Sequence, residues 1–298
     1  MDNDVTDAAI ALDRLHISED TEIDIDDATE SPSPAASSSL LASPESNTIR
    51  DCKPDASVPI ILCDAFYGFP TQKRPRNERV RAVSRQLTNF LQWRSETSKE
   101  NSIKATTYVL GDGKDVASVK TRVDELGTQT RASTNEIIFH PDIKIQQFLD
   151  QQKDALLIQE SKEEVVYLSP DASYTLPVTC RPPRVVIIGM LIDRRITEDR
   201  SRRRAEESLK IQAAKLPLDE LCVRELSSCE PLNVDTVMEL IQRWWWNCDK
   251  LEQRLQQRKN NDSGNTGRFY KKCFIEAAAF AMKSQRDRHP NRTVHKTD

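Results

Sequence analysis

Uninterrupted apolar runs alternate along this chain with segments whose apolar residues recur every three or four positions. Short runs rich in β-branched residues are typical of buried strands, and the wider spacing is typical of helices that bury one face. The alternation therefore predicts an α/β fold with a largely parallel sheet and helices on both faces. Strands are predicted at 58–64, 105–110, 135–139, 164–168, 184–191 and 214–216, and helices at 78–94, 143–157, 200–211 and 234–255.

The strand predicted at 184–191 carries the most informative local pattern. Its apolar run ends at Gly189, and Asp193 and two arginines follow within a few residues. Open α/β sheets bind ligands beyond the carboxyl ends of their strands, and a glycine there lets the backbone approach a ligand. A carboxylate beside cations at this point is placed to act on something polyanionic.

Charge is distributed unevenly between the first 57 residues and the rest of the chain. Residues 1–57 contain fourteen acidic and three basic side chains and no aromatic residue, whereas the remainder carries a net charge of +7. A segment with so little apolar surface cannot offset the entropy lost on ordering, so we predict that it is a disordered acidic tail. The basic body favours a polyanionic partner.

The cysteines, histidines and glycines disfavour several functional classes. Seven dispersed cysteines without a C-x-x-C pair, with four scattered histidines, argue against a metal site and favour reduced thiols in the cytoplasm or nucleus. No apolar run is long enough to predict a membrane span, and the acidic N-terminus argues against mitochondrial import. Seven glycines, none in a phosphate-binding motif, disfavour a nucleotide triphosphatase.

Two clusters of cations are candidates for contacts with the phosphates of a nucleic acid. One surrounds the start of the first predicted helix, and the other follows the strand at 184–191. A single cluster has a simpler explanation as a solvated surface, but two clusters beside strand ends favour a nucleic-acid backbone. The candidate residues are Lys73, Arg74, Arg76, Arg81, Arg85, Arg202 and Arg203.

The triplet Trp244-Trp245-Trp246 lies on the last long predicted helix. Neighbouring helical residues point about 100° apart, so the three indole rings cannot share one face. We expect one or two of them to pack in the core, and stacking of the third on a base is the alternative.

Several segments, in order, resemble a family of SPOUT-class tRNA methyltransferases that modify N1 of the purine at the ninth tRNA nucleotide. The opening strand ends in Asp64, the first helix carries Gln86, and a Tyr-Leu-Ser turn contains Leu168. The glycine-to-aspartate strand follows, and a Leu-Pro loop begins at Leu216. The family usually has two glycines where this chain has Gly189-Met190, and asparagine is common where Asp235 stands. The likeness covers about two thirds of the chain, roughly 58–255.

The resemblance implies a deep trefoil knot at the C-terminal end of the sheet and a bound S-adenosylmethionine. It implies that Asp193 is the catalytic base, because guanine N1 loses a proton on methylation, and that Asp64 and Gln86 orient the base or assist. Contacts to the cofactor are expected at Leu168, Gly189, Asp193, Arg194, Arg195, Ile196, Thr197, Ser201, Leu216 and Glu230.

Together these observations predict a SPOUT-type parallel-sheet domain at 58–258, after the tail at 1–57 and before a flexible linker and short basic helix at 259–298. The short helix is expected around 274–282. We expect a monomeric tRNA (guanine-N1)-methyltransferase, with adenine as an alternative target. The alternative from another functional class is an inactive SPOUT-fold protein that binds RNA or acts as a scaffold.

Overall fold

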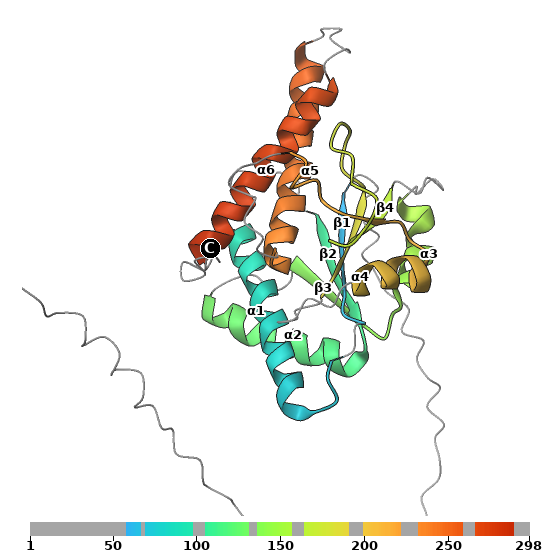
Figure 1. The fold of residues 1–298 in the computed structure, drawn as a ribbon. Coiled ribbons are helices and arrows are strands. Elements are labelled where there is room, and N and C mark those ends of the chain that lie inside the picture. The colour runs from blue at the N-terminus through green and yellow to red at the C-terminus, as the bar shows by residue number, and fades with distance from the viewer. Residues whose placement is uncertain are drawn as a thin grey trace, which may run out of the picture. The chain divides into compact units, whose positions relative to one another are not determined.

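A computed structural model describes residues 58–66, 69–97, 105–130, 136–156, 164–190, 199–221, 232–258 and 266–288. The predicted acidic tail lies outside these residues. Within them, the strands form a single sheet that helices cover (Figure 1). The strands are β1 (Ile60–Asp64), β2 (Thr106–Gly111), β3 (Ile137–Pro141), β4 (Val165–Leu168), β5 (Val185–Gly189) and β6 (Ala213–Ala214). The helices are α1 (Lys73–Thr97), α2 (Gly113–Thr130), α3 (Ile145–Leu156), α4 (Arg200–Arg203), the π-helical η2 (Arg204–Leu209), α5 (Val234–Arg258) and α6 (Thr266–Arg288).

Every strand pairing in the sheet is parallel, in the order β3-β2-β1-β5-β4-β6. The two central strands, β1 and β5, are in register, so that Asp64 lies beside Gly189. All five residues of β1 are buried, because helices cover both faces of the sheet. The predicted parallel α/β sheet is thus confirmed.

Alternate residues of the strands feed two separate apolar clusters. Ile61 and Cys63 of β1 pack with residues of α1, α2, α5 and α6, whereas Ile60 and Leu62 pack with residues of α3 and η2. This two-residue period places four helices on one face and the shorter helical segments on the other. The carboxyl edge of the sheet, which both layers flank, is where the site residues are expected.

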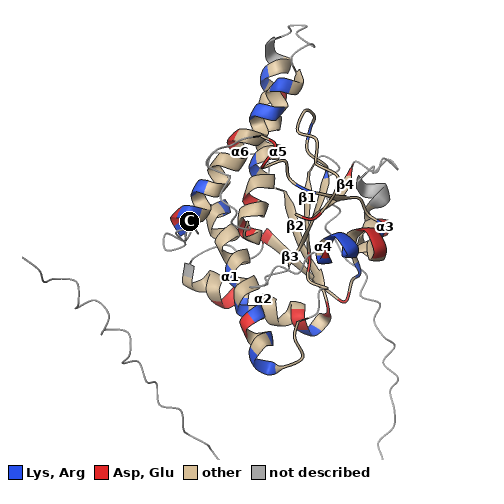
Figure 2. Ribbon diagram, in the orientation of Figure 1, with Lys and Arg blue, Asp and Glu red and all other residues tan. Residues whose placement is uncertain are grey.

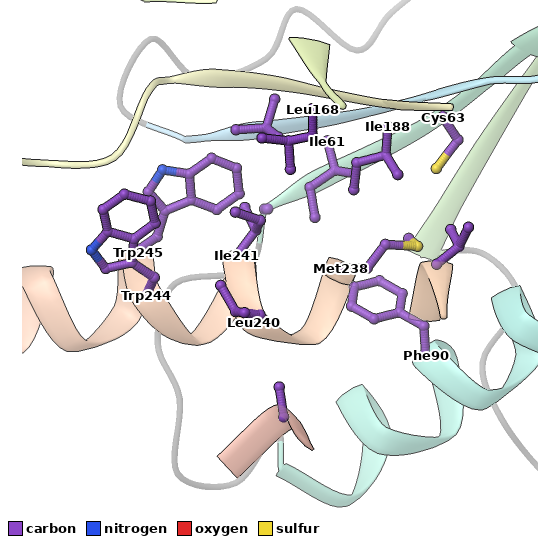
Figure 3. Packing of buried hydrophobic residues seen from close by; sticks show 14 of the residues in the cluster. Ile61, Cys63, Phe90, Leu168, Ile188, Met238, Leu240, Ile241, Trp244 and Trp245 are labelled. Carbon is purple, nitrogen blue, oxygen red and sulfur yellow. The ribbon is translucent and has the colours of Figure 1, made fainter. Parts of the chain in front are cut away.

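Helix α5 forms the centre of the layer that consists of α1, α2, α5 and α6 (Figure 3). Met238, Ile241 and Trp245 face the sheet at helical spacing, as predicted, and Trp244 is also fully buried. Trp246 is only partly buried and lies under the Lys250 ammonium group, which is 3.7 Å from its ring centroid. Two of the three tryptophans therefore pack in the core, as expected from the helix geometry.

The sequence analysis missed one helix and underestimated another. Helix α2 was missed because its buried apolar side chains are only three valines, Val116, Val119 and Val123, among many polar residues. Valine has a lower helix propensity than leucine, which weakens the pattern. Helix α6 is not the short helix expected around 274–282, since it spans Thr266–Arg288 and buries Phe274 and several alanines against α5.

Candidate active site at the carboxyl edge of the sheet

The carboxyl ends of β1, β4 and β5 bring three predicted site residues together. Asp64 pairs with Gly189, and Leu168 pairs with Ile188 next to it. Gly189 is the only residue of β5 that is not buried. The backbone of the central strands is therefore accessible at one point of this edge, and that point lacks a side chain. Leu216 follows the bridge between Thr175 and Lys215 at the carboxyl end of β6, on the same edge.

Asp64 is fully buried at the end of β1, and three groups donate hydrogen bonds to its carboxylate. Tyr167 Oη and Arg204 Nε donate to Oδ2 at 3.1 and 3.0 Å, and the backbone N–H of Phe66 donates to Oδ1 at 3.0 Å. A buried charge is tolerated only when it is paired and hydrogen-bonded, as here. These contacts join β1, β4 and η2, which suits a positioning role; a catalytic role for Asp64 stays a prediction.

The partnership with Arg204 was missed in the sequence, although Arg204 lies in the second basic cluster. A carboxylate that ends a fully buried strand needs a cationic or hydrogen-bonding partner, but the pattern does not say which of many arginines supplies it. In the structure, the local helix geometry selects Arg204. The helical segment changes from α to π at Arg204 and ends at Lys210, which has a positive φ. Such π turns are frequent at functional sites.

A second contact ties the same helical segment to the turn after β4. The hydroxyl oxygens of Ser169 and Ser201 are 2.7 Å apart, and Asp171 Oδ2 accepts the backbone N–H of Asp199 at 2.9 Å. Ser201, a predicted cofactor contact, is thus held beside Leu168. The carboxyl edge therefore combines a backbone opening at Gly189 with a polar wall formed by Ser169 and Ser201.

The side chain of Met190 does not occupy this opening. Its side chain is 3% exposed and belongs to the apolar cluster between the sheet and α1 and α5, while its N–H donates to the carbonyl of Asp64 at 2.9 Å. The methionine that replaces the family's usual second glycine is accommodated in the core. The remaining predicted cofactor contacts, and the proposed base Asp193, lie outside the described residues: Asp193, Arg194, Arg195, Ile196, Thr197 and Glu230.

Gln86 caps the N-terminus of α5. Its Oε1 accepts the backbone N–H of Val234 at 2.7 Å, and Oε1 of Gln285 on α6 accepts the N–H of Asn233 at 3.0 Å. The first N–H groups of a helix lack partners within the helix, so side chains from elsewhere stabilise its start. The observed role of Gln86 is to position α5, and a direct role in catalysis stays a prediction.

Asp235, in the first turn of α5, is fully buried at a position where the family commonly has asparagine. Asn89 Nδ2 donates to its carboxylate at 3.1 Å, and Arg288 Nε lies 3.5 Å away. Arg288 also approaches the buried Glu239 at 3.3 Å. Burial, the largest effect, raises the pKa of Glu239 despite Arg243 and Arg288 beside it. Helix α6 thus supplies the cation that lets this chain carry an aspartate at position 235.

The predicted RNA-binding cations differ in their surroundings. The guanidinium group of Arg76 is 2.8 Å from Asp115, so it is committed to joining α1 to α2, and Arg202 is 2.8 Å from Asp199. A hydrogen bond from Arg202 lowers the pKa of Asp199. Arg74 is highly exposed and lies 3.6 Å from Glu78. The others are exposed, on the N-terminal half of α1 and on α4: Lys73, Arg81, Arg85 and Arg203. Figure 2 shows both groups of cations.

Some chemistries find no support in the described part of the chain. It contains no cluster of three or more His, Cys, Asp or Glu suited to a metal ion. None of its helices is long and apolar enough to cross a membrane. Buried Cys63 is a poor nucleophile, because burial, and to a lesser degree Asp64, raises the pKa of its thiol to about 12.

Comparison with known proteins gives a family match over more than half of the chain. Residues 79–259 match the family model described as tRNA (guanine(9)-N(1))-methyltransferase TRM10/TRM10A. Similar solved structures include a full-length spTrm10–SAH complex, with 18% identity, a TM-score of 0.44 and coverage of 75% of this chain and 98% of that one. A dual-specific Trm10 from Thermococcus kodakaraensis has 14% identity and a TM-score of 0.41, covering 74% and 99%. No curated protein matches the chain.

Proposed function

The chain belongs to the tRNA (guanine(9)-N(1))-methyltransferase family TRM10/TRM10A, and on that premise we propose that it methylates guanine N1 at the carboxyl edge of its sheet. The observation that carries this location is the break in burial at Gly189, between the buried ends of β1 and β4. We further propose that the chain forms the trefoil knot expected of the SPOUT class at this edge.

S-adenosylmethionine supplies an electrophilic methyl group. The residues at the edge fit such a cofactor, since Gly189 and Leu168 offer backbone groups and Ser201 offers a hydroxyl at the end of β4. Arg204 and Tyr167 hold Asp64 and with it the ends of β1 and η2, so that the wall of the site keeps its shape. A rigid wall holds the purine in line with the methyl group, which is a large part of the rate advantage of an enzyme.

Asp193 is the proposed base. It follows Gly189 by four residues in the sequence, a length of chain that spans at most about 14 Å. With S-adenosylmethionine bound as methyl donor, guanine N1 would lose its proton on methylation, and the Asp193 carboxylate would accept that proton. Guanine requires this proton transfer, whereas adenine N1 carries no proton, which makes the base requirement a way to separate the two substrates.

A methylation assay tests the proposal directly. Wild-type protein and the Asp193→Asn variant are incubated with labelled S-adenosylmethionine and tRNA transcripts that differ only at nucleotide nine, and reverse-transcription stops are mapped. We expect a stop at G9 with the wild type, and a rate lower by roughly 10²–10⁴ with the variant because general-base assistance is lost. Cofactor binding should survive in both. Binding of the cofactor without any stop at nucleotide nine would favour the inactive RNA-binding alternative.

We also propose that the protein acts as a monomer in a reducing compartment, the cytoplasm or nucleus. Among the described residues the exposed large apolar side chains are scattered, being Tyr174, Phe269 and Phe280, whereas a stable dimer interface needs a contiguous patch. Four described cysteines are unbonded. Light scattering of the purified protein tests the first point: a mass twice that of the chain contradicts it.

A further inference from the structure

The antiparallel pair of α5 and α6 extends beyond the amino edge of the sheet. Gln242 Oε1 accepts the N–H of Ala105, just before β2, and Trp245 Nε1 donates to Pro183 O, just before β5. Helix α5 has thus reached the amino edge by Trp245, and the turns from there to Arg258 add about 20 Å. Asn247 Nδ2 donates to Cys273 O, so α6 follows α5 into this extension. We call residues 247–258 and 266–273 the overhang; it forms the top of Figure 1.

The two acidic residues of the overhang have partners within the molecule. They are Asp249 and Glu252, and Arg181 lies 3.7 and 2.6 Å from their carboxylates. Tyr270 Oη also donates to Glu252 at 2.9 Å. Both carboxylates are therefore occupied on the side of the overhang that faces the loop carrying Arg181.

Four cations of the overhang have either no ion pair or only a weak one among the described residues. Arg254, Arg268 and Lys271 are exposed and have no ion pair with any residue that the structure describes. Lys272 is 73% exposed and 3.7 Å from Glu276, a distance and exposure at which an ion pair contributes little. We call these four residues the basic tip. In Figure 2, Lys and Arg dominate this end of the helix pair.

We propose that the basic tip is a second tRNA-binding surface, which holds phosphates of a base-paired arm far from the methylated nucleotide. This rests on the proposed function, since it assumes that tRNA is bound at the carboxyl edge. The five-residue strands separate the two edges by about 17 Å, and the tip residues lie about 5–14 Å beyond Trp245 along the helices, so the tip is roughly 20–30 Å from Gly189. About six to nine base pairs cover that distance, and a folded tRNA has arms of this length.

The chemistry favours backbone contact over base reading. Flexible lysines and arginines on the outside of a helix reach phosphates, which supply affinity and orientation without sequence information. Such a contact would hold different tRNAs in the same way and leave recognition of guanine to the other edge. The tip should therefore change tRNA affinity and not the chemical step.

The test uses the full chain with the triple substitution Arg268→Gln/Lys271→Gln/Lys272→Gln. Its matched control is Lys120→Gln/Arg122→Gln/Lys144→Gln, which removes one arginine and two lysines from α2 and the segment before α3, where Lys120 and Arg122 form surface ion pairs with Asp124 and Glu125. A third variant, Arg268→Lys/Lys271→Arg/Lys272→Arg, keeps the charge. Binding of tRNA is measured by fluorescence anisotropy over a salt series, with thermal unfolding as the check on folding.

We expect the tip variant to raise the dissociation constant at least about tenfold at 0.1 M salt, and to lower the slope of log K against log salt by roughly 2. The control and charge-keeping variants should bind like the wild type. The methylation rate at saturating tRNA, and cofactor binding, should be equal in all four proteins.

Unchanged affinity and salt slope in a folded tip variant would overturn the inference while wild-type methylation at nucleotide nine continued to support the proposed function. Tighter tRNA binding by the tip variant would also overturn it, because the tip cations would then oppose tRNA binding. Loss of methylation by the wild type itself would instead contradict the proposed function.

Discussion

The two edges of the sheet are built in different ways. At the carboxyl edge of β4, β5 and β1, polar side chains meet: Asp64 with Tyr167 and Arg204, and Ser169 with Ser201. At the amino edge, large apolar rings close the structure, above all Trp244 and Trp245. Polar contacts between distant segments fix geometry, whereas apolar burial stabilises the fold. The difference fits the proposed methyl transfer at the carboxyl edge and a mainly apolar stabilisation of the fold at the amino edge.

The largest expected effect concerns the amino edge. Trp244 is fully buried and meets Phe274 edge-to-face at 4.9 Å, so Trp244→Ala should lower the free energy of unfolding by roughly 3–5 kcal/mol. The methylation rate per folded molecule should not change. Urea unfolding measures the stability, and an assay at low temperature measures the methylation rate per folded molecule. A lower rate per folded molecule would show that the amino edge also contributes to catalysis.

Two milder substitutions separate burial from hydrogen bonding at that edge. Trp245 Nε1 donates to Pro183 O, whereas Trp244 Nε1 is buried and has no partner among the described residues. Trp245→Phe should therefore cost about 1 kcal/mol more than Trp244→Phe, because it leaves the Pro183 carbonyl unpaired. Equal costs would mean that the indole hydrogen bond does not contribute.

The next effect concerns the carboxyl edge. Arg204→Ala leaves the fully buried Asp64 without its cation, which should lower the free energy of unfolding by roughly 3 kcal/mol, and should weaken cofactor binding because η2 loses its tie to β1. Calorimetry with S-adenosylmethionine below the unfolding temperature measures the binding. The control Arg122→Ala, which removes a solvent-facing side chain of α2, should change neither quantity by much. Wild-type cofactor affinity in Arg204→Ala would contradict the positioning role.

A smaller effect tests how the start of α5 supports the site. Gln86→Ala and Gln285→Ala each remove one acceptor from the first turn of α5, so each should cost about 1 kcal/mol of stability. If Gln86 only positions α5, both variants should lower the methylation rate equally. A much greater loss of rate with Gln86→Ala, at equal stability, would show that Gln86 also takes part in catalysis.

The smallest expected effect is a pH dependence of stability caused by His140, at the carboxyl end of β3. His140, near the end of β3, stacks on Tyr108 at 5.7 Å, and burial lowers its pKa below the ordinary 6.5. The neutral ring is thus favoured by folding: its contribution to stability is present above pH 6.5 and is lost as pH falls through the lowered pKa. Unfolding curves should show a small loss of stability in that range that is absent in His140→Phe. An identical pH dependence in both proteins would assign the titration to another group.

The sequence predicted the sheet because its buried strands are short apolar runs. The family resemblance supplied Asp64, Leu168 and Gly189 as site residues, and the structure brings them together because parallel strands end at one edge. It did not predict that Arg204, and no other arginine of its cluster, returns to Asp64, because that choice depends on the π turn. It missed α2, whose three buried valines give a weak helical pattern, and it underestimated α6. Contacts between segments far apart in sequence, such as Gln86 with Val234, leave no local signal.

The two edges also offer alternative places for a small ligand, and a structure with bound S-adenosylhomocysteine distinguishes them. A cavity of about 550 Å³ lies near the amino edge, lined by residues that include Tyr174, Arg181 and Gln212. The account predicts the ligand at the carboxyl edge instead, against Leu168, Gly189 and Leu216. Ligand density in the amino-edge cavity, with the carboxyl edge closed, would contradict the account.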